Sequence, residues 1–314
     1  MTGTLRIDIA VCTYRRPQLA ETLRSLGALT VPDGVALRLI VADNDIAPSA
    51  ERIVGEMAGK LPFPVDYVHC PASNISLARN ACLDHSQAEW LAFIDDDCSA
   101  SPDWLAALVT MARRTGADAV LGPVAAIYGD AAPAWMRRGD FHSTNPVFVR
   151  GELLTGYTCN VLMNVAAPSL EGRRFDLALG RTGGEDTEFF TGMVRDGGRL
   201  AFAEAALASE PVPADRAQFG WLAKRRFRTG QTHGRLLAKT SGGTSGRAVA
   251  LAAAKAAFCA GGAVLAGLRP VARNRYALRS IMHGGVVSGL LGVREITLYG
   301  DASAGIERER DHAA

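Results

Sequence analysis

Three adjacent carboxylates, Asp95, Asp96 and Asp97, directly follow an apolar run at residues 90–94. Aspartates often end strands and open turns, but that explains a single Asp better than three in a row. Like charges this close together need a cation, and hard oxygen ligands suit Mg²⁺ or Mn²⁺, whose coordination is completed by waters and substrate phosphates. The run therefore predicts a divalent-metal site that takes a nucleotide diphosphate as co-ligand.

A second acidic pair, Glu185 and Asp186, follows two glycines and begins a helical stretch. Carboxylates in the first turn of a helix are stabilised by the helix dipole, so the pair is typical of a helix start. A carboxylate that lies in a cleft is also suited to deprotonate a hydroxyl as a general base. The residues alone support both interpretations.

Basic side chains form a third group. They are Arg216, Lys224, Arg225, Arg226, Arg228 and Arg235, with Trp221 among them. Residues 215–314 carry 16 Lys and Arg against 6 Asp and Glu, whereas the first 214 residues carry 18 against 26. Such a run is usually a solvated helix face, and pairing with a diphosphate is the competing interpretation. No recognised nucleic-acid-binding motif accompanies it, so nucleic acid is not an expected partner.

The elements that must position these groups alternate between short apolar runs and helical stretches. Strands are predicted at residues 7–14, 37–42, 65–69, 90–94 and 119–122, and helices at 17–29, 49–58, 76–86 and 102–115, with Pro17 in the first turn of one and Ser49 as the N-cap of another. This alternation predicts βαβ units and a mainly parallel sheet. Ligands of such sheets bind beyond the carboxyl ends of the strands, so Thr13, Asp43 and Asp95 should line one crevice.

The rest of the chain divides differently. Residues 123–156, rich in Gly, Pro and aromatics, are predicted to be pocket-building loops. The segment SGGTSG after Thr240 predicts a flexible connector, which places a catalytic domain at residues 1–240 and a basic, Ala-rich helical region at 241–314. The six cysteines contain no CxxC pair and the amino terminus shows no secretory signal, so reduced thiols and a cytoplasmic catalytic part are expected.

Six ordered motifs between residues 6 and 235 resemble those of the family 2 glycosyltransferases with the GT-A fold. They are IAVCTYRRP at residues 9–17, IVADN at 40–44, NISLARN at 74–80, FIDDD at 93–97, TGYTCN at 155–160 and the ED pair at 185–186. Along nearly the whole chain the sequence is similar to rhizobial exopolysaccharide glycosyltransferases of the succinoglycan type. The resemblance implies an α/β fold, with a mainly parallel sheet flanked by helices and a carboxy-terminal helical extension.

The resemblance also implies roles for individual residues. Asp97 and Asp95 would hold the metal, and Asp186, with Glu185 beside it, would be the catalytic base. The nucleotide sugar would be bound by Thr13, Tyr14, Arg16, Asp43, Arg79, Asp95, Asp96, Arg225, Arg226 and Arg228. The acceptor would meet Trp135, Gly156, Tyr157 and Asn160.

The function implied is metal-dependent, inverting transfer of a hexose, glucose from UDP-glucose, to a lipid-linked oligosaccharide with formation of a β-glycosidic bond. Two departures from the family pattern matter. Many relatives carry a histidine where this chain has Ser209, and the QxxRW element of processive synthases is absent, which favours transfer of one sugar per encounter. The alternative is a catalytically retired GT-A protein that binds glycan or scaffolds an assembly complex.

Residues 248–268 are long enough to cross a bilayer but carry Lys255 near their middle. The strongly apolar side chains favour insertion by roughly 2 to 4 kcal/mol, and a central Lys costs about as much. Leu251, Phe258 and Leu265 recur every seven residues, which is typical of an amphipathic helix lying on an anionic membrane surface. The lipid-linked acceptor that the resemblance implies favours this position, peripheral to the cytoplasmic side of the bacterial inner membrane. The alternative is a helix packed on the catalytic domain or on a second subunit of a homo-oligomer.

Other nucleotide-using enzymes lack support. A dehydrogenase would show GxGxxG after the first strand, and a P-loop enzyme would show GxxxxGK[ST], and neither motif is present. A nucleotidyltransferase would carry a Gly-rich basic loop where this chain has residues 13–17 without glycine. The glycosyltransferase interpretation is therefore the main prediction.

Overall fold

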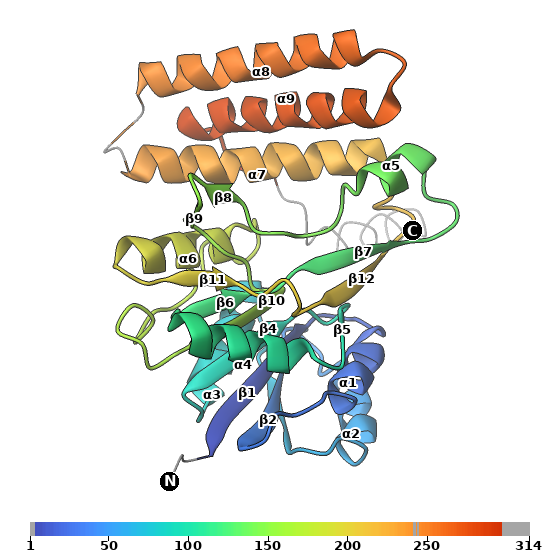
Figure 1. Ribbon diagram of the computed structural model, residues 1–314, viewed down its shortest axis with the longest axis vertical. Coiled ribbons are helices and arrows are strands. Elements are labelled where there is room, and N and C mark those ends of the chain that lie inside the picture. Colours follow the sequence, from blue (N-terminus) through green and yellow to red (C-terminus); the bar gives the residue numbers. More distant parts are fainter. Residues whose placement is uncertain (1–3, 241–242, 244, 297–314) are drawn as a thin grey trace, which may run out of the picture. The chain divides into compact units, whose positions relative to one another are not determined.

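A computed structural model describes residues 4–240, 243 and 245–296 (Figure 1). The chain forms two compact units. The first runs from the amino terminus to Ile127 and also contains His142–Gly180 and Glu185–Pro211. The second contains Tyr128–Phe141, Arg181–Gly184 and the chain from Val212 onward.

A seven-stranded sheet in the order β11-β6-β10-β4-β1-β2-β3 forms the centre of the first unit. The strands are β1 (Leu5–Thr13), β2 (Val35–Asp43), β3 (Val65–His69), β4 (Trp90–Ile94), β6 (Ala119–Leu121), β10 (Asn160–Asn164) and β11 (Leu200–Phe202). Strands β1 to β4 pair with one another in parallel, and β10 is antiparallel to both β4 and β6. The predicted mainly parallel sheet is confirmed, with β10 as the inserted antiparallel strand.

Helices cover both faces of this sheet. They are α1 (Leu19–Gly27), α2 (Glu51–Ala58), α3 (Ile75–His85), α4 (Trp104–Thr115) and α6 (Glu185–Arg195). Alternate residues of a strand point to opposite faces, so Ile9 packs with the buried side chains of α1 and α4 while Ala10 packs with those of α3 and α6. Burial on both faces explains why these strands are continuous apolar runs in the sequence.

Local details differ from the sequence-based expectations. Helix α1 begins at Leu19, so Pro17 lies before it, and α2 begins at Glu51 with Ala50 rather than Ser49 at the N-cap. The region expected to be loops contains four short elements: β7 (Val124–Tyr128), α5 (Ala134–Gly139), β8 (Phe148–Val149) and β9 (Glu152–Leu153). Elements this short span too few residues for a periodic pattern to emerge.

A small sheet in the order β5-β12-β7 adds to the first unit. Strand β5 (Ser99–Ala100) directly follows the aspartate run and pairs antiparallel with β12 (Ala208–Val212), so that Ser209 lies opposite Ser99. This pairing brings the Ser-Glu-Pro segment beside the end of β4. A contact between residues more than a hundred positions apart thus depends on a strand of two residues.

Three long helices build the second unit, and α9 (Pro270–Leu290) packs against both α7 (Phe219–Thr240) and α8 (Gly246–Ala266) (Figure 1). Glycines allow the close approach of α7 and α9: a Cβ added at Gly285 would lie 2.1 Å from the Phe227 carbonyl oxygen, and one at Gly234 would lie 2.3 Å from that of Val286. Because α7 packs so closely on α9, the compact units divide before α7, and the catalytic-domain boundary expected near residue 240 stays a prediction.

Candidate active site

The carboxyl ends of β1, β2 and β4 meet at one edge of the sheet. Thr13 at the end of β1 pairs with Asp43 at the end of β2, and β4, which pairs with β1, leads directly into Asp95. Parallel pairing carries the polar residue after each strand to the same edge. The structure therefore brings these three residues together, as expected from the sequence.

The three aspartates at this edge have unusual electrostatics. Burial, opposed by Arg79 and reinforced by Asp97, raises the pKa of Asp95 to about 8. Burial and the neighbouring Asp97 raise the pKa of Asp96 to about 6. Burial and mutual repulsion thus favour the protonated forms of Asp95 and Asp96, and a bound cation would favour the ionised forms.

A candidate metal site combines the aspartate run with a residue that the sequence analysis missed. One ligand atom each from Asp97, Cys98 and Glu210 lie within 4.8 Å of one another. Burial raises the pKa of the Cys98 thiol well above its usual range, which keeps it protonated and makes it a poor ligand. The two carboxylates are hard oxygen donors of the kind that Mg²⁺ and Mn²⁺ take, so the residues present fit such a cation.

Glu210 offers a carboxylate ligand next to Ser209, the position where the family pattern has a histidine. It is adjacent in sequence to Ser209, and β5–β12 pairing places it beside Asp97. The signal available in the sequence was the acidic residue next to the position where relatives carry histidine. Glu210 could not be singled out from the sequence, because nothing local indicates which side chain of β12 faces the aspartates.

Arg16 lies beside Asp96 and Asp97 of the aspartate run. Its guanidinium lies 3.9 Å from an oxygen of Asp96 and 3.6 Å from an oxygen of Asp97. Its side chain is about a third exposed, at 32%, so it remains accessible to a ligand. The preceding Tyr14 lies at the same strand end, with the guanidinium of Arg15 5.1 Å from its ring centroid.

Glu185 and Asp186 begin α6, and the structure separates their environments. Glu185 is buried and forms an ion pair with Arg79, and its second oxygen accepts no hydrogen bond from any described residue. Asp186 accepts a 2.6 Å hydrogen bond from the backbone N–H of Thr187. Burial and the adjacent Glu185 raise the pKa of Asp186 to about 6. A carboxylate that titrates near neutrality is well matched to general-base work.

Arg79 joins the two acidic groups. It is buried, its guanidinium lies 5.6 Å from the ring centroid of Phe175, and its charge acts on Glu185, Asp95 and Asp186. The structure thus places this residue among the carboxylates of both motifs. Its expected contact with the nucleotide stays a prediction.

Asp43 and Asn160 are also engaged within the protein. The Asp43 carboxylate accepts hydrogen bonds from the backbone of Asp45 and Ala50 and from the Tyr67 hydroxyl. The Asn160 amide accepts from Trp104 and donates to two backbone carbonyls, those of residues 123 and 206. These hydrogen bonds fix the loop after β2 and the start of β10, while the ligand contacts expected of both residues stay predictions.

The remaining acceptor candidates lie in different units. Gly156 packs so closely on Phe190 that an added Cβ would lie 2.9 Å from its ring, and the Tyr157 hydroxyl donates to the Gly122 carbonyl at 2.8 Å. Trp135 belongs to the second unit, where its ring packs edge-on against Phe141 at 5.0 Å. Their acceptor role is not tested by these contacts.

The arginines of α7 also belong to the second unit. Arg225 lies over the ring of Trp221 at 5.3 Å. Burial, with Arg225 and Arg279 nearby, lowers the pKa of Arg226. Arg228 is buried and donates hydrogen bonds to the carbonyls of Thr182 and Gly183, in the loop that leads into α6. The hydrogen bonds of Arg228 stabilise this loop, and diphosphate binding by the three arginines stays a prediction.

Comparisons with known proteins identify the family of this chain. The model of glycosyl transferase family 2 matches residues 8–168. The chain is 60% identical over 298 residues to the succinoglycan biosynthesis protein ExoM of Rhizobium meliloti (strain 1021), which covers 95% of this chain and 96% of that protein. The chain belongs to glycosyl transferase family 2 and is a glycosyltransferase.

Solved structures support the GT-A fold. The mannosyltransferase PcManGT from Pyrobaculum calidifontis, in complex with GDP-Man and Mn²⁺, has a TM-score of 0.62 at 20% identity, with coverage of 93% of this chain and 89% of that one. S. aureus TarS 1-349 in complex with UDP-GlcNAc has a TM-score of 0.53 at 16% identity, with coverage of 92% and 93%. The GT-A architecture expected from the motifs is therefore confirmed.

Proposed function

We propose that this glycosyltransferase moves one hexose, glucose from UDP-glucose, to a lipid-linked oligosaccharide in the assembly of a succinoglycan-type exopolysaccharide, with inversion at the anomeric carbon. The observation that carries the proposal is the presence of two carboxylate sites in one unit. One is the strand-end cluster with Asp97 and Glu210, which suits a metal-bound diphosphate, and the other is Asp186, whose pKa is about 6. The name of the relative from Rhizobium meliloti supports the pathway.

Asp97 and Glu210 are the residues that would hold a divalent cation, Mg²⁺ or Mn²⁺, with Asp95 next to them. When bound, the cation supplies neutralisation of negative charge on the leaving diphosphate. The neighbouring solved structure with GDP-Man and Mn²⁺ supports this assignment. Arg16, close to Asp96 and Asp97, adds a second positive charge for the same leaving group.

Asp186 is the proposed base. Its carboxylate takes the proton of the acceptor hydroxyl while that oxygen forms a bond to the anomeric carbon, and the bond from this carbon to the diphosphate breaks. The leaving nucleotide carries away the electron pair. Direct displacement converts an α-linked nucleotide sugar into a β-glycoside. Burial, together with the negative charge of the adjacent Glu185 that Arg79 holds in place, raises the pKa of Asp186.

Helix α8 supports a place at the membrane. It is the described helix that is long and apolar enough to cross a bilayer by length and composition, with 11% of its most apolar window buried. Several of its large apolar side chains are exposed, Leu265 at 90% and Phe258 at 75%. Because Lys255 makes full insertion costly, α8 is proposed to lie on the cytoplasmic surface of the bacterial inner membrane.

Binding of the sugar donor tests the proposal. Purified protein is titrated with UDP-, GDP- and dTDP-sugars in Mn²⁺, Mg²⁺ or chelator, and wild type is compared with Asp97→Ala. Metal-dependent binding of a UDP-hexose that is lost in Asp97→Ala supports the donor site. Failure to bind any nucleotide sugar under these conditions would contradict it.

A further inference from the structure

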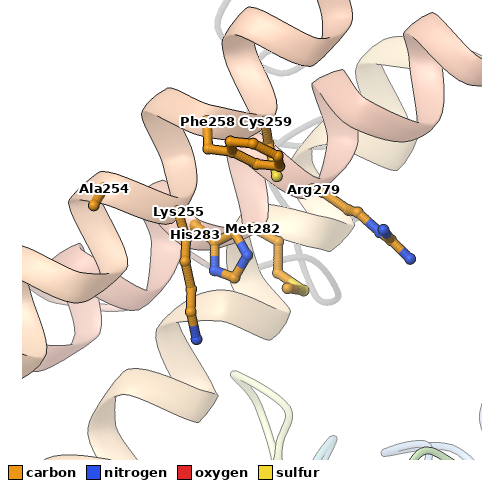
Figure 2. A pocket seen from close by; sticks show the side chains of 7 residues that line it. All are labelled: Ala254, Lys255, Phe258, Cys259, Arg279, Met282 and His283. Atoms are coloured by element: carbon orange, nitrogen blue, oxygen red, sulfur yellow. The ribbon is translucent and has the colours of Figure 1, made fainter.

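A hollow of about 430 Å³ lies between α8 and α9 in the second unit (Figure 2). Helix α8 contributes Lys255 and Phe258 to its lining, and α9 contributes Arg279 and His283. Lys255 and Phe258 are three residues apart on α8, so they share one face of the helix. The hollow thus combines cationic side chains with an aromatic wall.

In the part of the chain that the structure describes, no acidic side chain lines this hollow. The two helices and their connection, residues 246–290, contain no Asp or Glu. Among the described residues, no carboxylate forms an ion pair with Lys255, Arg279 or Arg226. Clustered like charges repel one another, so an anion that binds between them gains their combined attraction.

Neighbouring groups report the same positive field. Burial, followed by the charges of Lys255, His233 and Arg279, lowers the pKa of His283. Burial and Lys255 also lower the pKa of His233 on α7. Lys255 on α8 thus acts on both imidazoles, and Arg279 acts on His283.

The rim of the hollow is apolar and open to solvent. Phe258 is 75% exposed, and Leu251 and Leu265 lie two turns before and after it on α8, at 56% and 90% exposed. Residues seven apart fall on nearly the same helix face, so the three form one exposed stripe. A phosphate with attached hydrocarbon chains matches this arrangement, whereas a free phosphate would leave the stripe in water.

We propose that the hollow formed by Lys255, Phe258, Arg279 and His283 binds the phosphate of an anionic phospholipid headgroup, with the acyl chains along Leu251, Phe258 and Leu265. The inference rests on the proposed membrane-surface position and names the group that α8 recognises there. The occupant is bulk anionic phospholipid because α8 would lie at headgroup depth, where such lipids are abundant.

Vesicle binding by the full chain tests the site. Co-sedimentation is measured with phosphatidylcholine vesicles, with equal parts of phosphatidylcholine and phosphatidylglycerol, and with phosphatidylcholine doped with a polyisoprenyl diphosphate. The test variant is Lys255→Gln with Arg279→Gln. The matched control is Arg247→Gln with Arg269→Gln, which removes the same charge from exposed positions on or beside the same helices and outside the hollow.

We expect the test variant to bind phosphatidylglycerol vesicles about tenfold more weakly than the control, since each basic residue at an anionic surface contributes about a fivefold effect and those in a formed site contribute more. Equal losses in the two variants would overturn the site in favour of diffuse attraction. Selective binding of the doped vesicles, with no preference for phosphatidylglycerol, would overturn the assigned occupant.

A second variant and a separate readout keep the result interpretable. Phe258→Ser, at an exposed position, should weaken binding to phosphatidylglycerol vesicles while thermal unfolding stays unchanged, and unaltered vesicle binding would overturn the acyl-chain contact. Nucleotide-sugar binding is measured in the same samples. If nucleotide sugars bind but the test and control variants bind phosphatidylglycerol vesicles equally, the lipid site alone is overturned. If the wild-type protein binds no nucleotide sugar, the proposed function is overturned.

Discussion

The two units handle charge in opposite ways. In the first, Arg79 is buried among carboxylates, pairs with Glu185 and acts on Asp95 and Asp186, so most charge is compensated inside the fold. In the second, the cations on α8 and α9 face a stretch without any Asp or Glu. In the second unit Arg228 and Arg235 of α7 pair with Glu295, whereas α8 and α9 offer no acidic side chain of their own to their cations. An anionic ligand is therefore favoured at α8 and α9, and a cation at the carboxylates of the first unit.

Of the changes considered, substitution of the proposed base Asp186 should have the largest effect, and the effect is on kcat. Asp186→Asn keeps the shape of the side chain but cannot accept the acceptor proton, so kcat should fall about 10²- to 10⁴-fold while donor affinity is retained. Single-turnover kinetics with donor titration measure both quantities. Glu188→Gln, in the same first turn of α6, is the matched control. Retained turnover in Asp186→Asn would transfer the role to another group.

The second unit can be loosened without touching the carboxylates. Gly285→Ala places a Cβ 2.1 Å from the Phe227 carbonyl, so the free energy of unfolding should fall by about 1 to 3 kcal/mol. The adjacent Gly284→Ala meets no atom within 4 Å and should be neutral or stabilising by up to about 1 kcal/mol. Thermal and denaturant unfolding measure the difference, and equal stability of the two variants would rule out close helix packing as the reason for Gly285.

Glu210 tests whether the first unit completes its metal site across β12. Glu210→Gln should weaken Mn²⁺ binding by about tenfold or more, since even outer-shell partners of metal ligands contribute 10- to 100-fold. Calorimetric Mn²⁺ titration measures this, with the exposed Glu204→Gln as control. Unchanged affinity in Glu210→Gln would remove this residue from the site.

The pH dependence of kcat should give the smallest of these effects, and it tests the role of Asp186 in the first unit. Because burial and Glu185 raise the pKa of Asp186 to about 6, the base is protonated below this value and ionised above it. At saturating Mn²⁺, kcat should rise with pH and reach about half of its plateau near pH 6. A rate independent of pH between 5 and 8 would contradict the assignment, and Asp186→Asn should lose the dependence.

Much of the first unit could be predicted from local pattern. The sequence predicted the alternation of strands and helices, because strands buried on both faces form uninterrupted apolar runs. It also predicted the polar strand ends and the positions of Asp95 and Asp186. The short elements between residues 123 and 156 could not be predicted, since strands and helices of two to six residues are too short to carry a periodic pattern. Glu210 was missed for the same reason, because its approach to Asp97 depends on β5.

The sequence by itself determined which residue types could do chemistry and which strands would carry them. Only the tertiary structure decided that Arg79 pairs with Glu185, that Glu210 lies beside Asp97, and that α9 packs against both α7 and α8. The physical reason is range: helical and strand patterns follow from neighbours in the chain, whereas the partner of a charge depends on strand register and on glycines such as Gly285 that let distant helices meet.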